Sequence, residues 1–137
     1  MTILIPLLLI TVNLFAPGDE RPVLVSPVIT HPYAKIITAI GKVESNLDTL
    51  AYNPKESAVG FFQVRQIRLD DYYQRTGKRY SLRDMYDYNK AEEVFLYYTT
   101  RYKPCEIEKI ARTWNGGYEG MNKKSTIKYW RKVQNAL

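Results

Sequence analysis

The sequence predicts one mainly helical domain preceded by an extended arm. From Tyr33 to Leu137, apolar side chains recur at the three- and four-residue spacing of a helix face. No stretch alternates apolar and polar residues for the length of a strand, so at most a short β-hairpin fits, between residues 46 and 62. Prolines at positions 17, 22, 27 and 32 exclude a long helix before the domain.

The N-terminal part divides into two segments. Residues 1–16, MTILIPLLLITVNLFA, are apolar but short for a membrane span, which favours an export or anchoring segment with transient membrane contact. The alternative is an arm that packs on another subunit. Residues 17–32 carry the spaced prolines and are expected to form a linker. The composition changes at Tyr33, so the domain is placed at residues 33–137, and its location is expected to be exported, periplasmic or in the cell envelope.

Two helices are expected in the first half of the domain. One spans residues 33–44, and a second contains Ile67 and Leu69 and ends at Gly77. The stretch between them, residues 45–60, is rich in turn-forming residues.

Four further helices, one of them short, are expected in the second half. Ser81 with Asp84 matches a capping box that starts a short helix, and Asn89 is expected to cap the next one. The stretch EIEKIARTW forms a helix that stops at residues 116–117, and Ser125 is expected to cap the last helix. The apolar faces of the three longer helices hold Val94, Phe95, Tyr98 and Tyr102; Ile107, Ile110, Ala111 and Trp114; and Ile127, Trp130, Val133 and Leu137.

Charge and cysteine content restrict the function classes. Lys and Arg number 20 against 14 acids, a net charge of +6, which favours anionic partners. With Cys105 and His31 as the single cysteine and histidine, neither an internal disulfide nor a zinc site can form. No phosphate-binding glycine loop or Ser-His-Asp set appears, so we expect no metal and no cofactor.

Glu44 stands out because it lies on an apolar helix face. It follows Ile40 by four residues and Ile37 by seven, so all three share one side of the helix. An apolar environment disfavours the charged form of a carboxyl group and raises its pKa. Such an acid can stay protonated near neutral pH and donate its proton to a leaving oxygen.

Two side-chain amides accompany aromatic residues elsewhere in the domain. Gln63 follows Phe61 and Phe62, and Asn115 follows Trp114. Amides can bind the N-acetyl and hydroxyl groups of a sugar, and aromatic rings offer it a flat apolar face. Turn or capping roles for the amides and core positions for the rings are the alternatives. Together with Glu44, these residues suggest acid-catalysed cleavage of a glycosidic bond.

In their order along the chain, these motifs resemble those of the soluble-lytic (Slt) type of lytic transglycosylase. Glu44-Ser45 match the family's catalytic Glu-Ser, and residues 60–63, Gly-Phe-Phe-Gln, match its Gly-Leu-Met-Gln motif. Residues 113–117, Thr-Trp-Asn-Gly-Gly, are similar to its Ala-Tyr-Asn-Ala-Gly, and residues 125–133 to its closing Glu-Thr-x-x-Tyr-Val-x-x-Val. The resemblance covers about residues 33 to 135. The chain departs from the family with Phe61-Phe62 for Leu-Met, Trp114 for Tyr and Ser125 for Glu.

The resemblance implies a lysozyme-like fold and a peptidoglycan substrate. Glu44 would be the single general acid/base that cleaves the bond between N-acetylmuramic acid and N-acetylglucosamine and leaves 1,6-anhydro ends. Asp48 and Glu56 are the candidates for a second carboxylate, ahead of Asp70 and Asp71, and solvated loop charges are the favoured interpretation of all four. The residues expected to bind the glycan are Ser45, Gly60, Phe62, Gln63, Trp114, Asn115 and Tyr129.

Three alternatives remain beside the transglycosylase. With a second carboxylate the domain would be a hydrolytic lysozyme. With little or no activity it would be a glycan-binding or structural module of a secretion system or a phage particle, and so virion-associated in the latter case. A nucleic-acid binder would use the basic residues of the last helix, but a solvated face or an anionic wall polymer explains them equally well, and we expect no nucleic-acid partner. These basic residues are Lys123, Lys124, Lys128, Arg131 and Lys132.

Overall fold

The computed structural model of the chain describes residues 31–137. The expected export segment and nearly all of the expected linker lie outside these described residues and stay predictions. The first helix begins at Ala34, next to the boundary expected at Tyr33. Within the described part, no helix has both the length and the apolar character needed to cross a membrane.

The described residues form a mainly helical domain with one small hairpin, as the sequence predicts. In chain order the elements are α1 Ala34–Ser45, β1 Tyr52–Asn53, β2 Ala58–Val59, α2 Gln66–Thr76, the 3₁₀ helix η1 Leu82–Tyr86, α3 Tyr88–Thr99, α4 Ile107–Gly116, the 3₁₀ helix η2 Gly120–Asn122 and α5 Ser125–Ala136. The two strands are antiparallel, with Tyr52 opposite Val59 and Asn53 opposite Ala58. The expected hairpin between residues 46 and 62 is therefore confirmed.

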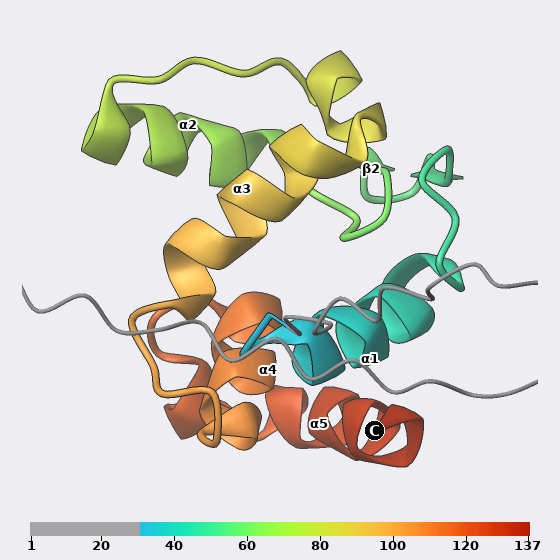
Figure 1. Ribbon diagram of the computed structural model, residues 1–137, viewed down its shortest axis with the longest axis vertical. Coiled ribbons are helices and arrows are strands. Elements are labelled where there is room, and N and C mark those ends of the chain that lie inside the picture. The colour runs from blue at the N-terminus through green and yellow to red at the C-terminus, as the bar shows by residue number, and fades with distance from the viewer. Residues whose placement is uncertain (1–30) are drawn as a thin grey trace, which may run out of the picture.

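The elements divide into two groups that lie one above the other (Figure 1). Helices α1, α4 and α5 pack together in the lower group. The hairpin, α2 and η1 make up the upper group, and α3 runs from η1 down to α4. The two groups supply the two walls of the site described below.

An aromatic cluster in the core joins the two groups. Phe62, from the turn after β2, stacks on Phe95 of α3 with ring centroids 4.3 Å apart. Both rings meet the edge of Trp114 of α4, at 6.2 and 4.9 Å. Phe62 and Phe95 are completely buried and Trp114 is 6% exposed. Since large rings buried in this way contribute much of a small core's free energy of folding, this cluster fixes α4 relative to the upper group.

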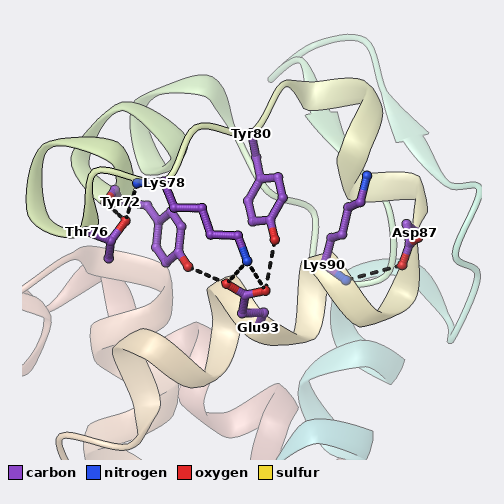
Figure 2. A network of polar contacts seen from close by, with 7 residues as sticks. All are labelled: Tyr72, Thr76, Lys78, Tyr80, Asp87, Lys90 and Glu93. Carbon is purple, nitrogen blue, oxygen red and sulfur yellow. Dashed lines mark hydrogen bonds and ion pairs between the residues drawn. The ribbon is translucent and has the colours of Figure 1, made fainter.

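A polar network holds the upper group together on its outer side (Figure 2). Glu93 of α3 accepts hydrogen bonds from the hydroxyls of Tyr72 and Tyr80, at 2.7 and 2.8 Å. The Lys78 ammonium group donates to both oxygens of the same carboxylate. One side chain of α3 thus binds α2 and the connection between α2 and η1 at once.

The expected helix caps are right in one case and wrong in two. The Ser81–Asp84 capping box is present at the start of η1. Asn89 does not cap α3, because Asp87 takes that place and its Oδ1 accepts from the backbone N–H of Asn89 at 2.9 Å. Ser125 is the first residue of α5 and makes no side-chain cap.

Helix α5 is rotated relative to the expected apolar face. Thr126 and Val133 are buried, whereas Ile127 and Leu137 are each 37% exposed, so the expectation for these two is wrong. Thr126 faces inward because its hydroxyl accepts from Arg112 Nε at 2.9 Å and contacts the carbonyl of Gly120 at 2.7 Å. A satisfied polar residue therefore occupies the position that hydropathy alone assigned to Ile127.

Candidate active site

A cleft of about 670 Å³ runs between the two groups of elements. The hairpin and the start of α2 line it from the upper group, and the ends of α1 and α4 with one side of α5 line it from the lower group. Five of the residues singled out from the sequence meet here: Glu44, Gln63, Trp114, Asn115 and Tyr129. Ser45, Gly60 and Phe62 do not line the cleft.

Glu44 lies in the last turn of α1, where the chain turns away through Asn46 with a positive φ of 55°. The hydroxyl of Tyr129 donates to Glu44 Oε1 at 2.7 Å. Burial is the main cause that raises the pKa of Glu44 to about 7, and the charge of Glu56 adds to it. The bond from Tyr129, the charge of Arg65 and the indole of Trp114 act in the opposite direction. Burial thus shifts the pKa of Glu44 in the direction that its position on an apolar helix face suggests.

Ser45 and Gly60, which do not line the cleft, shape the backbone around Glu44. Ser45 Oγ donates to the carbonyls of Gly41 and Phe61, at 3.1 and 2.9 Å, and so fastens the end of α1 to the turn after β2. Gly60 has a φ of +76°, and a Cβ there would lie 2.0 Å from the carbonyl oxygen of Met85. No other residue fits this position without a shift of the backbone.

Phe62 is wrong as a glycan-binding residue because its ring is completely buried. Its stacking on Phe95 places it in the core, behind the cleft wall. Phe61 is buried as well and packs against α1, where a Cβ on Gly41 would lie 2.0 Å from its ring. The two rings therefore support the cleft from behind.

Gln63 and Asn115 reach the cleft from opposite groups. Gln63 has a φ of 50°, and its Nε2 donates to the carbonyl of Gly60 at 3.0 Å, which holds the amide in a fixed orientation. Asn115 follows Trp114 near the end of α4 and is exposed at the cleft. The structure thus places one restrained amide and one exposed amide on facing walls.

The candidates for a second carboxylate differ in whether they line the cleft. Glu56 lines the cleft and lies 3.7 Å from Arg65. Asp48 does not line it, and its Oδ1 accepts from the backbone N–H of Leu50 at 2.8 Å. Asp71, which the sequence ranked low, does line the cleft. Burial acts to raise the pKa of Asp71, but hydrogen bonds from Tyr98 and Arg75 keep it below its ordinary value.

Arg68 and Tyr118 are cleft residues that the sequence analysis missed. Ile67 of α2 is 74% exposed, whereas its neighbour Arg68 packs against the ring of Trp114. The sequence spacing could have identified Arg68, since it precedes buried Tyr72 by four residues and so shares its helix face.

Among residues 31–137, no three His, Cys, Asp or Glu side chains come together in a way that could hold a metal ion. No family model matches the chain. No curated protein and no solved structure matches it either.

Proposed function

We propose that this chain is a peptidoglycan lytic transglycosylase with a lysozyme-like fold. It cleaves the β-1,4 bond between N-acetylmuramic acid and N-acetylglucosamine and leaves 1,6-anhydro ends. The observation that carries the proposal is Glu44, an acid with a pKa of about 7 on the wall of an open cleft. The order of the motifs around it, from Glu44-Ser45 to Tyr129, supports the family assignment.

Glu44 supplies both proton transfers of the reaction. In its neutral form it protonates the bridging oxygen, and the bond from that oxygen to the muramic C1 breaks. The N-acetyl group of the same sugar stabilises the positive charge on C1, as the resemblance implies. The Glu44 carboxylate then removes the proton from the muramic C6 hydroxyl, whose oxygen bonds to C1 and closes the anhydro ring. A pKa near 7 suits a group that must first give and then take a proton.

The hydroxyl of Tyr129 orients the carboxyl group of Glu44 throughout this cycle, because it donates to one oxygen and leaves the other for the substrate. Gln63 and Asn115 bind N-acetyl or hydroxyl groups on the two walls. The substrate places the protein in the cell envelope or on a virion, with peptidoglycan strands as its partner and a secretion-system or phage assembly as its setting.

Clearing of purified cell walls tests the proposal. Glu44→Gln keeps the shape of the side chain but cannot donate a proton, so we expect the rate of turbidity loss to fall by roughly 10² to 10⁴-fold. Glu93→Gln is the matched control, because Glu93 lies in the polar network outside the cleft, and it should clear walls at the unmodified rate. Clearing by Glu44→Gln at the unmodified rate would refute the mechanism. If the unmodified chain binds walls without clearing them, the chain is a glycan-binding module.

Hydrolysis is the second candidate, and the position of Glu56 favours it. Glu56 lines the same cleft as Glu44, so it could activate a water molecule as the second carboxylate of a lysozyme. Mass analysis of the released muropeptides separates the two reactions. Anhydro ends support the transglycosylase, and reducing ends would assign hydrolysis.

A further inference from the structure

Arg68 is half-buried in the cleft wall, where its guanidinium packs against two aromatic rings. Its guanidinium carbon lies 4.5 Å from the ring centre of Tyr98 and 4.6 Å from that of Trp114. Its Nη2 donates to the carbonyl oxygen of Trp114 at 2.7 Å. Arg68 of α2 thereby contacts the end of α4 across the cleft.

Arg68 forms no ion pair with any carboxylate in residues 31–137. Asp71 lies near enough to influence it, but the oxygens of Asp71 already accept from Arg75 and Tyr98 at 2.8 and 2.7 Å. Burial accordingly lowers the pKa of Arg68. A half-buried guanidinium without an anion is unfavourable, and a negative group from outside would relieve this cost.

The guanidinium keeps hydrogen-bond donors open to the cleft. Of its five N–H groups, a described acceptor takes only one, the carbonyl of Trp114. Within the described residues, no buried side-chain nitrogen or oxygen lacks a partner, so the remaining nitrogens of Arg68 are accessible. Since Arg68 lines the cleft, these donors are open to whatever occupies it.

The other cations of the cleft wall are exposed to solvent, and Arg65 has an anionic partner as well. Arg65 pairs with Glu56 at 3.7 Å. Lys123 Nζ donates to the carbonyl of Gly116 at 2.6 Å. Lys132 is exposed on α5, where water solvates it. Arg68 is therefore the cation of this wall best placed to gain from an anionic ligand.

We propose that Arg68 binds a carboxylate of the ligand and gives the cleft a preference for acidic over neutral glycans. This inference rests on the proposed function, because muramic acid carries a lactyl carboxyl group that is either free or extended by a peptide with carboxylates of its own. A planar guanidinium is suited to such a group, since it can donate two parallel hydrogen bonds to it.

Changes to the ligand test the proposal without altering Arg68. The probes are a GlcNAc-MurNAc tetrasaccharide with free lactyl carboxylates, its methyl ester, the same strand carrying its peptides, and the neutral chitin tetrasaccharide. Calorimetry on the full chain with Glu44→Gln prevents turnover. We expect the acid, or the peptide-bearing strand, to bind about tenfold more tightly than the ester and the chitin oligomer. Which of the two binds better identifies the source of the carboxylate.

Changes to the protein complete the test. With Arg68→Gln added, the acid and the ester should bind equally. Arg101→Gln is the matched control, because Arg101 also lies near Tyr98, at 5.8 Å, but does not line the cleft, and it should keep the preference. Should Arg68→Gln fail to fold, the ester comparison still decides.

Three results would overturn the inference, and they differ in whether they also overturn the proposed function. If neither the acid nor the peptide-bearing strand binds more tightly than the ester when Arg68 is intact, or if the preference survives Arg68→Gln, the role of Arg68 is refuted and the proposed function still stands. Failure of every glycan to bind refutes both.

Discussion

Glu44 and Glu93 both accept hydrogen bonds from tyrosine hydroxyls, yet their pKa values shift in opposite directions. Burial raises the pKa of Glu44 to about 7 although Tyr129 donates to it. The bond from Lys78 holds the pKa of Glu93 below its ordinary value, and Tyr72 and Tyr80 assist. A phenol therefore does not keep a carboxylate ionised against burial, whereas an ammonium group at a half-exposed site does.

The same difference in pKa separates the roles of Glu44 and Glu93. Glu93 is a fixed charge that connects α2 to α3 on the outer side of the upper group (Figure 2). Glu44 is a partly buried acid that forms no ion pair with a lysine or arginine of residues 31–137, so its proton remains available near neutral pH. Four substitutions test this contrast, and they follow in order of expected effect.

Glu44→Gln should stabilise the fold above pH 7. The unfolded chain releases this proton near pH 4.5 and the folded chain near pH 7, so the unfolded state binds fewer protons in between. The contribution of Glu44 to the free energy of unfolding of the unmodified chain therefore falls as the pH rises from 4.5 to 7. We expect the variant to gain on the order of 3 kcal/mol at pH 8 and nothing at pH 4. Urea unfolding at pH 4 and pH 8 measures the free energy of unfolding of both chains. A gain in stability that does not depend on pH would contradict the prediction.

Glu93→Gln should destabilise the fold at neutral pH, which is opposite to the effect of Glu44→Gln. A depressed pKa adds stability that is present above the unfolded value and is lost as the pH falls through the folded value. The variant should lose about 1 kcal/mol at pH 7, a modest figure because the side chain is 42% exposed. Its deficit should vanish in acid. The same unfolding experiment measures both variants, and a gain at pH 7 would break the contrast.

Tyr129→Phe should raise the pKa of Glu44 further. The hydroxyl stabilises the charged form of Glu44 and so lowers its pKa. Without the hydroxyl, the rise in pKa that burial causes is larger. The alkaline limb of the pH profile of wall clearing should move to higher pH. Tyr118→Phe, a cleft tyrosine whose hydroxyl contacts Asp71 instead, is the control and should leave that limb in place.

Glu56→Gln should lower the pKa of Glu44, since the negative charge of Glu56 raises it. This is the smallest of the four effects, because Glu56 acts through its charge at a side chain that is 60% exposed. The alkaline limb should move to lower pH, and added salt should reduce the difference from the unmodified chain. An upward shift would contradict the prediction.

The local features of the fold could be predicted from the sequence because they depend on neighbouring residues. The position of Glu44 four residues after Ile40 set its helix face, and the Ser81–Asp84 pair marked the start of η1. Gly77 marked the end of α2 in the same way.

The contacts between distant residues could not be predicted. Tyr129 is 85 positions from Glu44, and nothing local distinguishes it from the other tyrosines as the donor. Phe62 was expected in the cleft because a motif shows which residues gather but not which of them turn toward the core. Arg68 packs inward because the rings of Tyr98 and Trp114 offer its guanidinium a site that hydropathy does not register.

The most direct test of the account is a carbon-13 NMR titration of the Glu44 carboxyl group, assigned by comparison with Glu44→Gln. The account predicts a midpoint near pH 7, well above that of Glu93 in the same spectrum. A midpoint near the ordinary glutamate value of about 4.3 would mean that Glu44 is ionised at neutral pH and cannot serve as the proton donor.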